Sequence, residues 1–104
     1  MAGGAEEDPT LADIIWWKGD RVAVVEVSIK VNGEDVRRAS RRAMTLRSAG
    51  IDAFGVVIGE DWASLEAREM AKEEGVEWIV GGIPSKGMIS FRRLPSGGNR
   101  NEFN

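Results

Sequence analysis

Three polar side chains stand at every second position within the stretch VAVVEVSIKVN, which covers residues 22–32 and is otherwise apolar up to Asn32. They are Glu26, Ser28 and Lys30. Successive side chains of a β-strand point to opposite faces, so a strand over these residues predicts all three on one face. A carboxylate there can bind a hard cation, and an amine beside such a cation can orient an attacking water or stabilise charge on a phosphate. The pattern therefore indicates phosphate chemistry as one candidate function.

A second carboxylate, that of Asp13, is predicted to face Glu26 across a β-hairpin. The pair Gly19-Asp20 lies between two apolar runs and is a typical two-residue hairpin turn. In the register that this turn imposes, Asp13 lies opposite Glu26, with β-carbons about 5 Å apart. Like charges this close repel, whereas a shared Mg²⁺ ion would turn the repulsion into coordination. The alternative is a solvated sheet face on which both acids are structural.

The residue types that are missing narrow the chemistry further. The 104 residues include no Cys and no His, which excludes disulfides, thiolate metal ligands and imidazole catalysis. Any catalysis must therefore use carboxylates, Lys or hydroxyls. Gln is also absent, Arg outnumbers Lys ten to four, and charged residues make up 30% of the chain, which is typical of thermophilic proteins.

Charge is unevenly distributed along the chain. The net charge is −3, yet residues 34–50 carry five Arg against two acids, and residues 60–77 carry seven acids against two basic residues. The acidic balance argues against a protein that coats nucleic acid with its whole surface. A local basic stripe that contacts DNA remains compatible with it.

Length and hydropathy predict a single soluble domain. We expect it over residues 11–94, with mobile ends rich in Gly, Asn and charge at 1–10 and 95–104. No apolar run approaches the roughly 20 residues that span a membrane. The first ten residues lack the basic start and apolar centre of a signal peptide, so we expect a cytoplasmic protein.

The periodicity after the hairpin alternates between helical and extended. The first helix has Asn32 or Asp35 as its cap and Gly50 as its stop, and the second has Asp61 as its cap and Gly75 as its stop. The predicted elements are helices over 32–50 and 62–75, strands over 53–59 and 76–82, and an additional edge strand over 87–94. The predicted fold class is α/β, a mixed β-sheet with an N-terminal antiparallel hairpin followed by β-α-β-α-β and right-handed crossovers.

Asp13, the hairpin, the segment from Glu26 to Lys30, the basic helix and the next parallel strand together resemble a known core. They resemble the PD-(D/E)xK, or restriction-endonuclease-like, nuclease superfamily, and within it small uncharacterised archaeal nuclease-like domains. The resemblance covers residues 11–80. It implies a restriction-endonuclease-like core and hydrolysis of DNA phosphodiester bonds that depends on Mg²⁺, or on Mn²⁺ as its substitute. It also implies that Asp13 and Glu26 are the metal ligands.

The sequence departs from the family pattern at the position of the catalytic Lys. That residue should follow Glu26 by two positions, where this chain has Ser28, and Lys30 lies one step further along the same face. In one alternative Lys30 takes the catalytic role and Ser28 is an accessory hydroxyl. In the other the site is degenerate, and the fold serves dimerisation or nucleic-acid binding. A third alternative is a purely structural domain.

The first predicted helix carries a basic face. Arg37, Arg38, Arg41 and Arg42 lie opposite its apolar stripe. A solvated helix face is the ordinary role of such a charge run. The alternative is contact with the DNA backbone, because the Arg fork matches phosphate geometry and the helix directly follows the candidate catalytic strand.

The predicted hairpin has one face without an evident cover. The register puts Ile15 opposite Val24 and Trp17 opposite Val22 on the face of the two acids, while Trp16 belongs to the core on the other face. Superfamily members usually carry a helix before the Asp-bearing strand, and here only about ten mostly polar residues precede it. Monomers rarely expose such apolar patches, so we expect a homodimer or a covering partner chain.

Overall fold

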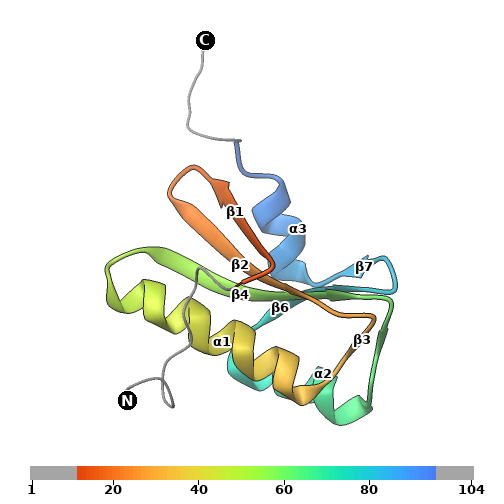
Figure 1. Cartoon of the computed structure of the whole chain (residues 1–104). Coiled ribbons are helices and arrows are strands. Elements are labelled where there is room, and N and C mark those ends of the chain that lie inside the picture. The colour runs from red at the N-terminus through yellow and green to blue at the C-terminus, as the bar shows by residue number, and fades with distance from the viewer. Residues whose placement is uncertain (1–11, 96–104) are drawn as a thin grey trace, which may run out of the picture.

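The computed structural model describes residues 12–95 of the 104-residue chain. They form an α/β fold in which three helices pack on a mixed sheet of five strands, and two short strands form a separate pair (Figure 1). The strands are β1 (Ile14–Lys18), β2 (Arg21–Val27), β3 (Lys30–Val31), β4 (Asp52–Gly59), β5 (Asp61–Trp62), β6 (Glu77–Val80) and β7 (Ile83–Pro84). The helices are α1 (Gly33–Ser48), α2 (Leu65–Glu74) and α3 (Lys86–Arg92). The predicted mobile ends fall outside the described residues except for Pro95.

The N-terminal hairpin has the predicted turn, and its register is as predicted from Ile14 to Lys18. The predicted pairing of Asp13 with Glu26 is not found, because β1 begins at Ile14 and the N–H of Asp13 donates to the carbonyl oxygen of Val25. β1 and β2 are antiparallel, with Ile15 opposite Val24 and Trp17 opposite Val22. Gly19 has a φ of 59°, a left-handed conformation that the first central residue of a type I′ or II′ turn requires. Such turns match the twist of the two strands, so the local sequence is enough to set this register.

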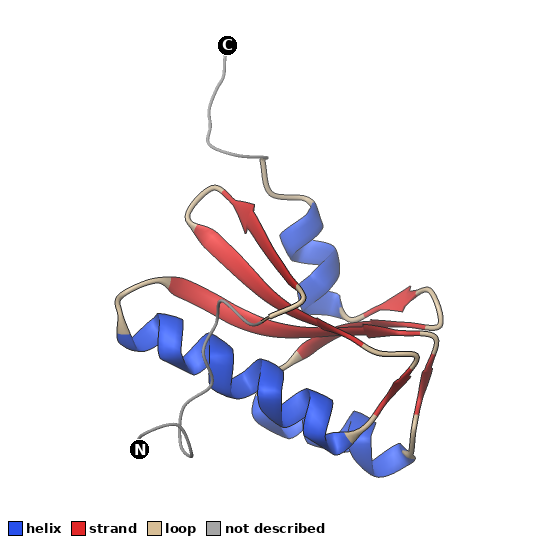
Figure 2. Cartoon of the chain, viewed as in Figure 1, coloured by secondary structure: helices blue, strands red, loops and turns tan. Residues whose placement is uncertain are grey.

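The centre of the sheet is parallel and is built by two crossovers. The strand order is β1-β2-β4-β6-β7, in which β2, β4 and β6 are parallel and β7 is antiparallel to β6. α1 connects β2 to β4 and α2 connects β4 to β6. Both helices cover the same face of the sheet, and α3 covers the other (Figure 2). The mixed sheet, the hairpin and the β-α-β-α-β order are confirmed.

Each face of the sheet has its own buried core. On the α1 side, Val22 and Val24 are fully buried and pack with Ala43. The expectation that these two valines lack a cover is therefore wrong, because α1 lies beneath them. On the α3 side, Phe91 packs edge-on against Trp16, as the predicted core role of this Trp requires.

The stretch over residues 22–32 is not one continuous strand. β2 ends at Val27, and the chain resumes as β3, which pairs with β5 outside the main sheet. The alternation of faces is lost at this break: Ile29 is 72% exposed while Val31 is fully buried. Gly59 of the neighbouring strand permits the bend, since a β-carbon there would lie 2.4 Å from the carbonyl oxygen of Ser28.

The helix boundaries follow local caps, and one predicted strand is a helix. Asn32 and Asp35 form a capping box at the start of α1, and Gly75 ends α2 in the left-handed conformation. The cap of α2 is Ser64 rather than Asp61, which belongs to β5. The predicted edge strand over 87–94 is wrong, because Ser85 accepts a hydrogen bond from the N–H of Met88 and starts α3.

None of the helices within residues 12–95 is long and apolar enough to cross a membrane.

Candidate functional site

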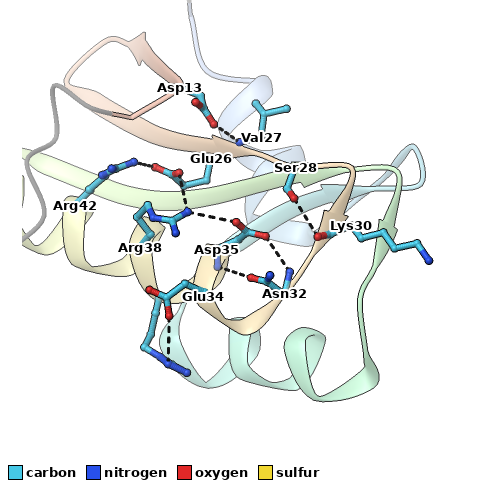
Figure 3. A network of polar contacts seen from close by, with 11 residues as sticks. Asp13, Glu26, Val27, Ser28, Lys30, Asn32, Glu34, Asp35, Arg38 and Arg42 are labelled. Carbon is cyan, nitrogen blue, oxygen red and sulfur yellow. Dashed lines mark hydrogen bonds and ion pairs between the residues drawn. The ribbon is translucent and has the colours of Figure 1, made fainter.

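The candidate site lies at the C-terminal end of β2, where the chain leaves the main sheet. Glu26 is only 4% exposed, and its carboxylate points toward α1 (Figure 3). Arg42 donates from Nη1 to Oε2 of this carboxylate. Arg38 forms a second ion pair, with 3.7 Å between its Nη1 and Oε1 of Glu26. The acid is thus enclosed between the strand and two guanidinium groups.

The sequence of α1 explains why both guanidinium groups reach Glu26. Arg38 and Arg42 are four residues apart, so they lie one above the other on the same side of the helix. The capping box at Asn32 sets where the helix begins. Asp35 of that box also pairs with Arg38 at 3.4 Å, which extends the network to the helix N-terminus (Figure 3). The network therefore holds α1 against β2 by charge as well as by apolar packing.

Burial raises the pKa of the Glu26 carboxyl above its ordinary value of 4.5. The hydrogen bond and charge of Arg42 act in the opposite direction, and the charge of Arg38 adds to them. The nearby charge of Asp13 raises the pKa further. The two carboxylates are therefore close enough to interact electrostatically, although the loss of solvent around Glu26 is the larger effect.

Asp13 immediately precedes β1 and has a hydrogen-bond partner of its own. Its Oδ2 accepts a hydrogen bond of 2.8 Å from the backbone N–H of Val27, and its own N–H donates to the carbonyl oxygen of Val25 at 3.1 Å. The carboxylate thus takes the place of a strand carbonyl and extends the hairpin by one interaction. Glu26, by contrast, points beneath the sheet (Figure 3).

Ser28 and Lys30 do not join Glu26 on one face. Ser28 donates from Oγ to the carbonyl oxygen of Lys30 at 3.0 Å, which closes the bend between β2 and β3. Lys30 is exposed, and its side chain extends away from Glu26 (Figure 3). The expected row of three polar groups is absent because the strand breaks at Ser28. The structure therefore brings Asp13 near Glu26 but leaves Lys30 apart.

This arrangement does not fit a Mg²⁺ ion held jointly by Asp13 and Glu26. Mg²⁺ requires free carboxylate oxygens and room for several waters. Both oxygens of Glu26 face guanidinium groups, and Asp13 accepts a backbone N–H. Within residues 12–95, acidic side chains nowhere gather in a group of three or more suited to a metal ion.

The predicted basic face of α1 is divided between two sides of the helix. Arg42 is buried, and Arg38 is turned toward Glu26. Their assignment to a solvent-facing, phosphate-binding stripe is therefore corrected. Arg37 remains on the outer side and pairs with Glu34 at 3.8 Å, and Arg41 is half-buried. The basic surface left for a polyanion is smaller than the sequence indicates.

A second feature of the same hairpin is its exposed apolar edge. β1 is the outermost strand on its side of the sheet, and Ile14, Ile15 and Trp17 are exposed, Trp17 by 53%. The sequence predicted the exposure of Ile15 and Trp17.

The Arg42–Glu26 pair was not predicted from the sequence. The signal that could have indicated this pair was one acid on a strand followed by two Arg at helical spacing.

No family model, no curated protein and no solved structure matches the chain.

Proposed function

We propose that the chain is a restriction-endonuclease-like module that works by association rather than by hydrolysis, with the outer edge of β1 as its contact surface. One observation carries the proposal: β1 is a sheet edge that exposes Ile14, Ile15 and Trp17 together. Edge strands in folded proteins are usually protected by charge, proline or a covering element. An exposed apolar edge therefore supports contact with a second copy or with another protein chain.

The surroundings of Glu26 support the non-hydrolytic part of the proposal. A carboxylate that binds a catalytic cation must be open to it, whereas this one is buried and ion-paired to Arg42 and Arg38. The hydroxyl of Ser28 replaces the family Lys and is bonded to the backbone. Asp13, Ser28 and Glu26 thus have roles in holding the hairpin, the bend and α1 together.

Thermal unfolding and cleavage assays with metal ions test the proposal. Protein free of contaminating nuclease is incubated with Mg²⁺ or Mn²⁺ and duplex, branched or single-stranded DNA. We expect no cleavage and no rise of Tm on adding either ion, because a ligand that binds the folded state raises its stability. Cleavage that is lost in Asp13→Ala would contradict the proposal.

Metal-dependent hydrolysis of DNA is the second candidate function. One observation favours it: Asp13 lies near enough to raise the pKa of Glu26, as two carboxylates poised for one cation would. In this alternative Asp13 and Glu26 hold Mg²⁺ or Mn²⁺, Lys30 and Ser28 assist the reaction, and Arg37 and Arg41 contact the DNA backbone. It requires Glu26 to leave Arg42 when the ion binds.

The two candidates give opposite results for one variant. Arg42→Met removes the competing cation of Glu26 while it retains an apolar stem against the sheet. If hydrolysis is the function, metal binding by this variant should be stronger than that of the wild type. If association is the function, neither ion should change its Tm. Asp13→Asn combined with Arg42→Met is the matched control, because it removes one of the two carboxylates.

A further inference from the structure

At two positions of β1 the backbone N–H and C=O groups face away from β2 and are open to a further strand. The pair of residues that flanks a two-residue turn is hydrogen-bonded, and such pairs alternate with open pairs along the hairpin. Ile14, Trp16 and Lys18 therefore bond inward to β2. The N–H and C=O groups of Ile15 and Trp17 point outward, beyond the edge of the described sheet.

We infer that a second copy of the chain occupies this edge, paired antiparallel through β1. The inference rests on the proposed function and names its partner. With the two-fold axis at Trp16, Ile15 lies opposite the partner's Trp17, and Trp17 opposite the partner's Ile15. Both are outward-facing positions, so every outward N–H and C=O of these residues is paired. The two main sheets then form one continuous sheet, which removes the free edge.

The side chains of β1 complement themselves in this register. Ile15 and Trp17 lie on the same face of the sheet, and an aromatic residue opposite a β-branched one is a favourable cross-strand pair. Both are exposed in one copy and would cover each other in two. A self-complementary patch is the requirement of a two-fold interface.

Lys18, which ends β1, meets no like charge in this register. It lies opposite the partner's Ile14, and its Nζ donates to the carbonyl oxygens of Arg92 and Leu94 at the end of α3. The pairing therefore brings no two like charges directly opposite each other.

The sequence at the two ends of the chain, residues 1–11 and 96–104, lacks the alternating apolar pattern of β1. The large apolar side chains in these two segments are those of Met1, Leu11 and Phe103. A second β1 supplies the pattern in full.

Light scattering over a concentration series tests the choice of partner. We expect the wild type to form a dimer, and Trp17→Lys and Ile15→Lys to raise its dissociation constant by at least about 100-fold, because each variant places two charges in an apolar interface. Leu65→Lys is the matched control. It replaces another exposed apolar residue, on α2, and should leave the dimer intact. Circular dichroism melts establish that each variant is folded.

Disulfide cross-linking tests the register, since the chain has no cysteine of its own. Paired α-carbons in a hydrogen-bonded pair are about 5.5 Å apart, within the range of a disulfide. The α-carbons of two Ile15 residues would be about 7–8 Å apart, as diagonal neighbours are. Under oxidation, a mixture of Ile15→Cys and Trp17→Cys chains should form the mixed disulfide at least tenfold faster than either variant links to itself.

The outcomes separate this inference from the proposed function. A wild type that stays monomeric at high micromolar concentration overturns the second copy as the partner, whereas metal-dependent DNA cleavage overturns the proposed function. A dimer that Trp17→Lys and Ile15→Lys leave unchanged overturns the use of this edge. If both variants weaken the dimer but the mixed disulfide forms no faster than the self-linked ones, only the proposed register is overturned.

Discussion

The guanidinium of Arg42 donates a hydrogen bond to the carboxylate of Glu26, and both side chains are buried between α1 and β2. Removing one member of a buried pair leaves an uncompensated charge, which is far more costly than replacing both. This relationship makes Glu26 a structural anchor of α1. It also leads to the first two predictions.

Arg42→Ala should lower the free energy of unfolding by about 3–5 kcal/mol, because Glu26 would lose its main partner in a buried position. Urea denaturation monitored by Trp fluorescence measures the change. Arg41→Ala, one residue earlier and half-buried, is the control and should change the free energy of unfolding by only about 0.5 kcal/mol. Glu26→Leu combined with Arg42→Met should be close to neutral. An Arg42→Ala loss no larger than that of Arg41→Ala would show that the pair is not an anchor.

The raised pKa of Glu26 predicts a specific dependence of stability on pH. An acid with a higher pKa in the folded state binds its proton more tightly there, so its protonated form favours folding. Its contribution to stability is therefore largest below 4.5, falls as pH rises through the folded-state value, and is constant above it. Urea denaturation of wild type and Glu26→Gln should show the free energy of the wild type declining relative to the variant across this window. A relative increase would contradict the direction of the shift.

Two further variants should shift, in opposite directions, the pH at which this decline in stability ends. Asp13→Asn removes a charge that raises the pKa of Glu26, so the decline should end at a lower pH. Arg42→Ala removes the hydrogen bond and charge that lower it, so the decline should extend to a higher pH. If the decline ends at the same pH in both variants, burial alone sets the pKa of Glu26.

The hydrogen bond from Val27 to Asp13 predicts that Asp13→Ala destabilises the protein in the absence of metal. The lost bond is expected to cost about 0.5–1.5 kcal/mol. Relief of the repulsion with Glu26 should offset only part of this loss. Asp13→Asn retains an acceptor for the Val27 N–H and should be closer to the wild type. Thermal and urea unfolding without added metal make the comparison, and a gain in stability for Asp13→Ala would indicate that repulsion dominates.

The hairpin could be predicted from the sequence because its determinants are local. Gly19 and Asp20 define a two-residue loop, and the loop length sets the register of the strands on both sides. The β-α-β order could be predicted as well, since the change from alternating to helical periodicity needs no knowledge of packing. Both follow from residues that are neighbours in the chain.

The partners of Glu26 could not be predicted in the same way. Arg42 is 16 residues further along the chain, and only the packing of α1 beneath β2 brings it to the strand. The helical pattern placed all the Arg side chains on the side away from the apolar stripe. A long side chain on the border of that stripe can nevertheless turn inward when a buried acid compensates its charge.

The break in the strand at Ser28 also depends on a distant residue. Residues 22–32 alternate without Gly or Pro, so no local signal ends the strand. The bend is instead accommodated by Gly59 on the neighbouring strand β4. Without this bend Ser28 and Lys30 would continue the face of Glu26, as the sequence predicts.

Gly59→Ala should therefore destabilise the protein through this bend. A β-carbon at Gly59 would lie 2.4 Å from the carbonyl oxygen of Ser28 and 2.7 Å from a methyl group of Val31, so the backbone of the bend would have to move. We expect a loss of about 1–3 kcal/mol, the usual cost of overpacking. Gly33→Ala is the matched control, because the nearest atom there is the flexible end of Met70 at 3.2 Å. Denaturant unfolding compares the two variants, and equal stabilities would mean that the bend does not depend on Gly59.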